Sequence, residues 1–75
     1  MTIAELNALP FYRAEEEFLK CSASKAWARA MARRRPFASA ERLLQAAEDI
    51  WRKVDPGAEE QNKVTLWRLK QFFPL

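Results

Sequence analysis

Apolar residues recur along this chain at helical spacing, and proline, serine and glycine divide them into five segments. The first segment, residues 3–9, follows Thr2, and Glu5 lies at the position that completes a capping box with that threonine. Pro10 comes directly after it and cannot continue a helix. We therefore predict a short amino-terminal helix that ends before Pro10.

The second and third segments each show one apolar face. From Phe11 onward, three glutamates near the segment start suit the positive end of a helix dipole. Ser22 or Ser24 can cap the third segment, whose basic residues gather toward its carboxyl end. The apolar face of the second segment consists of Ala14, Phe18 and Cys21 with Leu19 beside them, and that of the third of Ala23, Trp27, Ala30 and Met31.

The fourth segment, residues 40–54, has the clearest helical periodicity, and Ser39 is placed to cap it. Its apolar positions are Leu43, Leu44, Ala47, Ile50, Trp51 and Val54. We predict that the first five of these face Phe18, Trp27 and Met31 and form the main core. Residues 55–57, Asp-Pro-Gly, predict a turn before the fifth segment.

Residues 58–75 again indicate a helix, but its apolar residues cover most of the circumference. They are Val64, Leu66, Trp67, Leu69, Phe72 and Phe73. No alternating strand pattern and no repeat occurs in the sequence. The predicted fold is therefore all-α, a single small unit of four to five helices.

Composition narrows the possible functions. The chain has 75 residues, a formal charge of +3, one cysteine and no histidine. A chain of this length buries only about 60% of its unfolded surface, so its stability is expected to be marginal. The absence of histidine excludes histidine-dependent metal binding and acid–base catalysis, and Cys21 alone forms no internal disulfide. No apolar stretch reaches the length of a membrane span, and we expect a cytoplasmic protein.

Three consecutive arginines, residues 33–35, admit two interpretations. Together with Lys25 and Arg29 they would suit a nucleic-acid backbone, and Trp27 and Phe37 would then stack on bases. Alternatively, the arginines stabilise the negative end of the third helix, which Pro36 terminates. The small net charge favours a helix end, and large aromatic residues at helical spacing favour the core.

Other residues that carry reactive groups also have a structural interpretation. Cys21 has lysines nearby in sequence, but without a histidine as base we expect a buried, inert thiol. Two carboxylate pairs, residues 48–49 and 59–60, are adjacent in sequence and so point to different sides of a helix. We assign them to solvated faces and predict no catalytic residue, no metal site and no cofactor.

The order of several motifs resembles the amino-terminal part of the 2-oxo-4-hydroxy-4-carboxy-5-ureidoimidazoline (OHCU) decarboxylases. The resemblance runs from about Thr2 to Trp51 and begins with "AELNALP". A Cys-containing turn precedes a tryptophan helix, "RPF.S" follows, and "A.DIW" closes the match. The signature residues, all expected to be structural, are Cys21, Trp27, Arg35, Pro36, Phe37, Ser39, Asp49, Ile50 and Trp51.

The resemblance implies an all-α, cofactor-free and usually homodimeric enzyme, which decarboxylates a ureidoimidazoline to (S)-allantoin in urate breakdown. It also implies a later segment with a catalytic histidine, followed by a glutamate and an arginine. This chain instead ends in Phe73, Pro74 and Leu75. We therefore divide it into residues 1–54, which resemble the family, and a divergent helical tail, residues 55–75.

We expect a truncated or frame-altered relative that does not catalyse the reaction alone. Its substrate would be the small molecule of the family, and its partner either a second copy or a chain that supplies the missing half. Two other functions remain open: a small helical interaction module that pairs through its apolar carboxyl-terminal segment, and a weak nucleic-acid binder. Of these, nucleic-acid binding is disfavoured by the modest net charge.

Overall fold

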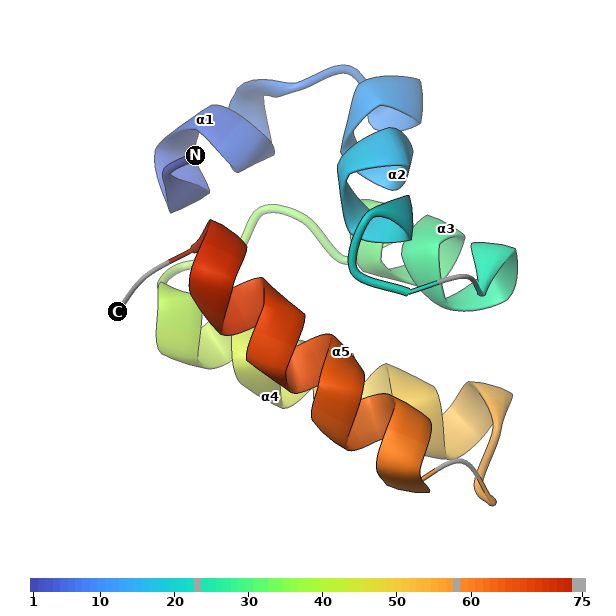
Figure 1. The fold of residues 1–75 in the computed structure, drawn as a ribbon. Helices are drawn as coiled ribbons and strands as arrows, with labels where there is room; N and C mark the ends of the chain where they lie inside the picture. The colour runs from blue at the N-terminus through green and yellow to red at the C-terminus, as the bar shows by residue number, and fades with distance from the viewer. Residues whose placement is uncertain (23, 58, 74–75) are drawn as a thin grey trace.

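The computed structural model describes residues 1–22, 24–57 and 59–73, and these residues form helices joined by short connections (Figure 1). The predicted all-α class is confirmed, and no strand occurs in the described part of the chain. The helices are α1 (Ile3–Ala8), α2 (Phe11–Leu19), α3 (Lys25–Arg33), α4 (Ala40–Val54) and α5 (Glu59–Phe72). In Figure 1, α4 and α5 lie side by side and run in opposite directions below α2 and α3.

Side-chain caps set the helix starts that the sequence predicted. The capping box at α1 is complete, because the Glu5 amide donates to Thr2 Oγ1 at 3.1 Å and the Thr2 amide donates to Glu5 Oε1 at 3.2 Å. At α3 the capping residue is Ser24, whose hydroxyl accepts from the Trp27 amide at 3.2 Å. Ser39 caps α4 by accepting from the Arg42 amide at 3.2 Å.

The core is built around three aromatic side chains from different helices. The rings of Trp27 on α3 and Trp51 on α4 stack with centroids 6.0 Å apart. Phe18 on α2 meets Trp27 edge to face at 5.7 Å. Met31 is also fully buried, so the predicted core shared by α2, α3 and α4 is confirmed.

Two predicted core positions lie at the margin of the core instead, and Val54, at the end of the α4 apolar stripe, is 38% exposed. Ala30 and Leu44 are only half-buried, whereas Ala28 and Ala32 of α3 are buried. The inward face of α3 is thus centred between Trp27 and Met31 and includes the small residues next to them, which leave room for the neighbouring helices. Ala23, another predicted core residue, lies outside the described residues, as do Pro74 and Leu75.

Helix α5 uses one side of its apolar circumference for the fold. Leu69 and Phe73 are buried in the common core, and Thr65 is buried beside them with its hydroxyl donating to the Gln61 carbonyl at 2.8 Å. By contrast, Val64 and Trp67 are 49% and 62% exposed. The apolar residues on the other side of α5 are therefore not covered by the rest of the fold.

Candidate functional site

The junction between α3 and α4 contains the densest set of long-range hydrogen bonds, and Arg35 is its centre. The Arg35 guanidinium donates from Nε to the Ala32 carbonyl at 2.9 Å. From Nη1 it donates to the carbonyls of Leu6 at 3.0 Å and Leu9 at 2.6 Å. These oxygens lie at the carboxyl-terminal ends of α3 and α1, where carbonyls run out of helical partners. The Leu6 carbonyl also accepts from the Leu9 amide at 3.3 Å. One cation thus ties two helix ends together.

Asn7 and Phe37 make the second link across this junction. The Asn7 side-chain amide donates to the Phe37 carbonyl at 2.9 Å, and the Phe37 amide donates back to Asn7 Oδ1 at 2.9 Å. The ring of Phe37 is buried and meets Phe18 edge to face at 6.4 Å. The segment that links α3 to α4 is therefore fixed to α1 by side-chain and backbone bonds, and Pro36 lies within it.

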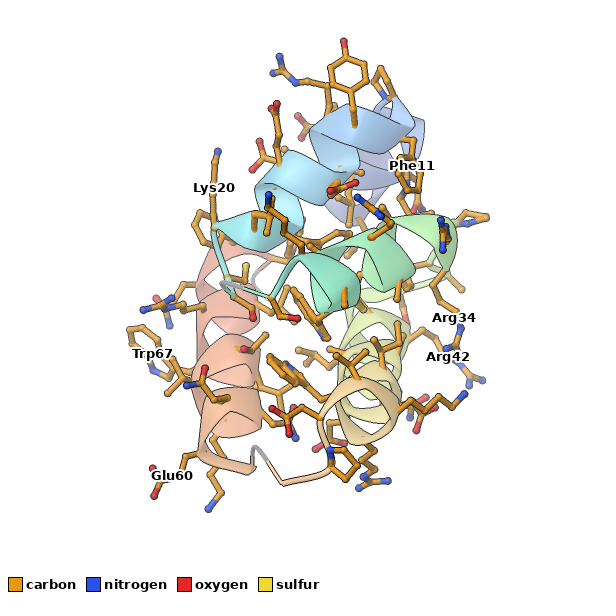
Figure 2. All side chains as sticks on the ribbon, turned by 90° about the vertical axis from the view of Figure 1, so that its right-hand side faces the viewer. Phe11, Lys20, Arg34, Arg42, Glu60 and Trp67 are labelled. Carbon is orange, nitrogen blue, oxygen red and sulfur yellow. The ribbon has the colours of Figure 1, made fainter. Side chains whose placement is uncertain are left out.

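The three arginines of residues 33–35 have different roles. Arg33 is the last residue of α3, and Arg34 is its carboxyl-terminal cap, so the predicted helix end is confirmed. Arg34 lies 3.9 Å from Asp49 in an exposed ion pair. Figure 2 shows Arg34 and Arg42 near one another at one edge of the molecule, where they line an open cavity of about 340 Å³.

The remaining signature residues lie in the core or on its border. Trp27 Nε1 donates to the Ala47 carbonyl at 3.3 Å, which ties α3 to α4. Ile50 and Trp51 are buried, and Asp49, the residue before them, faces outward. The structure thus brings together Arg35, Pro36, Phe37 and Ser39 at one junction, and it places Trp27 against Trp51 in the core.

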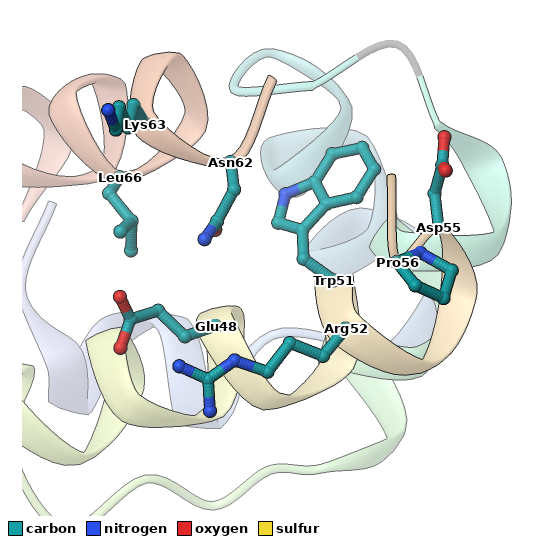
Figure 3. Close-up of a pocket in the computed structure, with 8 residues that line it drawn as sticks. All are labelled: Glu48, Trp51, Arg52, Asp55, Pro56, Asn62, Lys63 and Leu66. Atoms are coloured by element: carbon teal, nitrogen blue, oxygen red, sulfur yellow. The ribbon is translucent and has the colours of Figure 1, made fainter. Parts of the chain in front are cut away.

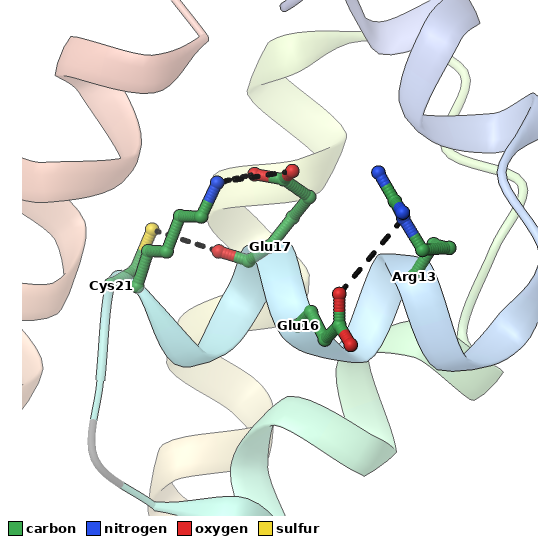
Figure 4. Close-up of polar contacts among 5 residues, drawn as sticks. Arg13, Glu16, Glu17 and Cys21 are labelled. Atoms are coloured by element: carbon green, nitrogen blue, oxygen red, sulfur yellow. Dashed lines mark hydrogen bonds and ion pairs between the residues drawn. The ribbon is translucent and has the colours of Figure 1, made fainter.

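Cys21 lies apart from that junction, at the end of α2 (Figure 4). It is buried, and its Sγ lies 4.0 Å from the Glu17 carbonyl, to which it donates a weak hydrogen bond. Burial raises the pKa of the Cys21 thiol to about 11, and this effect outweighs the opposing charge of Arg68. The thiol is therefore neutral at physiological pH, which agrees with the predicted inert role.

A cavity of about 230 Å³ lies between α4 and α5, near the turn that joins them (Figure 3). Its floor includes Trp51 from α4 and Asn62 from α5. Trp51 Nε1 and Asn62 Oδ1 are both buried and have no hydrogen-bond partner among the described residues. The charged side chains around the cavity are Glu48, Arg52, Asp55 and Lys63.

Two classes of site have no support in the described residues. Among the side chains that the structure describes, no three histidine, cysteine or acidic residues are placed to hold a metal ion. In the described part of the chain, no helix is long and apolar enough to span a membrane.

Most of this chain matches the sequence profile of a known protein family. The sequence profile described as OHCU decarboxylase matches residues 7–69. The chain belongs to the OHCU decarboxylase family. Searches of curated proteins and of solved structures find no match for this chain. In this OHCU decarboxylase relative, the matched range starts at Asn7, which binds the α3–α4 junction, and ends at Leu69 in the buried side of α5.

The sequence patterns did not point to Asn7 or Asn62, although the structure places both side chains in distinctive environments. Asn7 lies within the "AELNALP" motif, but its partner Phe37 is distant in the chain, so no local pattern predicts their bond. Asn62 lies in a polar stretch of α5 that looks solvated in the sequence. Its only sequence signal is its position one helical turn before Leu66, on the side of α5 that faces α4.

Proposed function

We propose that these 75 residues form a helical scaffold of the OHCU decarboxylase fold and do not catalyse decarboxylation by themselves. The reaction implied by family membership converts a ureidoimidazoline to (S)-allantoin in urate breakdown. One observation carries the proposal: the polar groups of three signature residues, Trp27, Arg35 and Ser39, are engaged in capping helices or holding them together. The guanidinium of Arg35 donates hydrogen bonds to three backbone carbonyls, and the indole of Trp27 donates to one. The hydroxyl of Ser39 caps a helix.

The proton-transfer chemistry of the family further supports a scaffold role. The resemblance implies a catalytic histidine, and this sequence contains none. The raised pKa of Cys21, about 11, leaves a neutral thiol, which is a poor general base at neutral pH. A histidine-bearing segment from elsewhere would be needed to complete an active site. We place this scaffold in the cytoplasm, where its single cysteine stays reduced.

A turnover assay with a complementation arm tests this proposal. The purified chain is mixed with the substrate, and substrate loss is compared with the buffer rate. The expected result is no acceleration by the chain alone. Acceleration should appear when a histidine-containing second half of a family member is added, because general acid–base groups typically contribute about 10²–10⁴-fold. Acceleration by the chain alone would contradict the proposal.

A second function, pairing with another chain, is favoured by the outer face of α5. Figure 2 shows Trp67 projecting from α5 away from the body of the protein, and it is 62% exposed. Val64 lies one turn earlier and is 49% exposed. The two residues are neighbours on the surface of α5, and adjoining exposed apolar side chains can form a contact surface. The partner would be a second copy of the chain or the segment that supplies the histidine.

Oligomeric state tests the pairing proposal with a matched pair of variants. Trp67→Ser removes the exposed ring on α5, while Tyr12→Ser removes an aromatic ring of α2 that is 64% exposed. Light scattering after size exclusion should show that Trp67→Ser weakens self-association or binding to the second half, and that Tyr12→Ser does not. Equal behaviour of the two variants and the wild type would show that α5 does not mediate pairing.

A further inference from the structure

Two residues that line the cavity between α4 and α5 each carry a buried polar atom, and the two atoms are of opposite hydrogen-bonding type. Trp51 Nε1 can only donate, and Asn62 Oδ1 can only accept. Neither has a partner in the described part of the chain. In Figure 3 the indole nitrogen of Trp51 lies on the ring edge that faces Asn62. Unpaired buried groups of this kind are rare in proteins and call for a partner.

The chemistry of this pair restricts what can satisfy it. A carboxylate can accept from Trp51 but has no proton for Asn62, and an ammonium group can donate to Asn62 but cannot accept from Trp51. A water or a hydroxyl group does both through a single oxygen, whereas a group that carries a carbonyl oxygen and an N–H on the same small planar unit does both through two separate atoms. The charges around the cavity favour neither an anionic nor a cationic ligand, because two acidic side chains are balanced by two basic ones. These are Glu48, Asp55, Arg52 and Lys63.

The size and shape of the cavity favour a terminal amide over an internal peptide bond. The cavity volume of about 230 Å³ exceeds what one water needs, and it is smaller than a typical drug-sized site. A terminal group can enter such a cavity end-on, whereas an internal peptide bond would need room for chain on both sides. The Pro56 ring and the Leu66 side chain supply apolar walls for the carbon skeleton.

We propose that the α4–α5 cavity binds a terminal amide group, –CO–NH2, of a small neutral molecule. Its carbonyl oxygen accepts from Trp51 Nε1, and its NH2 donates to Asn62 Oδ1. Both protein atoms are buried in the free protein, so binding includes a rotation of the half-buried Asn62 side chain into the cavity. The site includes the signature residue Trp51, but it uses none of the hydrogen bonds of the α3–α4 junction on which the scaffold proposal rests.

Nuclear magnetic resonance of the indole N–H groups tests the proposal directly. The chain has three tryptophans, and Trp51→Phe identifies the Trp51 signal while keeping an aromatic ring in the stack. Acetamide is the probe, and acetone is the matched control with a carbonyl but no N–H. Acetamide should shift the Trp51 signal saturably at concentrations on the order of millimolar to molar, as expected for so small a ligand. The Trp27 and Trp67 signals should stay in place.

Acetone should bind at least about threefold more weakly than acetamide, because it leaves Asn62 without a donor. In Asn62→Leu this preference for acetamide should disappear. Equal binding of acetone and acetamide by the wild-type chain would overturn the proposal, as would a linear, unsaturable shift. A Trp51 signal insensitive to acetamide would also overturn it, and would leave a direct Trp51–Asn62 bond or bound water as the partner. Once Trp51→Phe has identified the signal, the wild-type titrations decide the outcome even if Asn62→Leu fails to fold.

Discussion

Replacing Arg35 with methionine should remove the strongest polar link in the molecule. The guanidinium donates to three carbonyls, at 2.9, 3.0 and 2.6 Å. Hydrogen bonds from a charged donor contribute about 1.5–3 kcal/mol each, and the losses are not additive when the bonds share one side chain. Because Arg35 is only half-buried, we expect Arg35→Met to lower the free energy of unfolding by about 3–5 kcal/mol.

That loss is large for a chain of this size. A stability of about 0.05–0.15 kcal/mol per residue corresponds to about 4–11 kcal/mol for the whole chain. With a urea slope of about 1 kcal/mol/M, the unfolding midpoint of Arg35→Met should fall by about 3 M or more, or the variant should be unfolded without urea. Urea titration followed by circular dichroism measures this change.

The neighbouring arginine provides the matched control. Arg34 carries the same charge, but its side chain is 48% exposed and its ion pair with Asp49 spans 3.9 Å. Such pairs contribute about 0–1 kcal/mol, so Arg34→Met should change stability little. Arg35→Lys should be intermediate, since an ammonium lacks the planar fork that reaches several carbonyls. If Arg35→Met and Arg34→Met unfold within about 0.5 kcal/mol of each other, the proposed brace is wrong.

Three further predictions concern the core, a cap and the thiol. Trp51→Ala should cost about 3–5 kcal/mol in thermal or urea unfolding, because it empties the ring that stacks on Trp27; a melt unchanged from the wild type would contradict this packing. Ser39→Ala should cost about 1 kcal/mol and Ser39→Gly less, measured in urea; no loss in the alanine variant would show that the cap contributes nothing. Because burial raises the pKa of Cys21 to about 11, alkylation by iodoacetamide at about pH 8 should be roughly 100-fold slower in the folded protein than in denaturing urea; rates within tenfold would contradict this burial. The folded state holds the thiol proton more tightly than the unfolded state, so this contribution to stability is full below about pH 9 and is lost as pH rises toward about 11.

Helix boundaries and most of the core followed from local sequence patterns. Thr2, Ser24 and Ser39 cap helices through residues three positions ahead, so each cap is visible in a short window of sequence. The apolar stripe of α4 predicted its buried side because polar residues occupy the rest of that helix.

The links between distant segments could not be read in this way. Arg35 was expected to be structural, but its acceptors Leu6 and Leu9 lie 29 and 26 positions away, and no periodicity encodes that pairing. In α5, apolar residues occur on both sides of the helix, so the sequence pattern could not predict which side is buried. Only the packing against α4 decides that Leu69 faces inward and Trp67 outward.

The stereochemistry of allantoin formed in the presence of this chain is the measurement that tests the scaffold proposal most directly. Spontaneous decay of the ureidoimidazoline gives a racemate, whereas the family reaction gives the (S) enantiomer, and circular dichroism follows the enantiomeric excess. The account predicts a racemic product at the buffer rate, because the sequence contains no histidine and the polar signature groups hold the fold together. An excess of (S)-allantoin produced by the purified chain alone would contradict it.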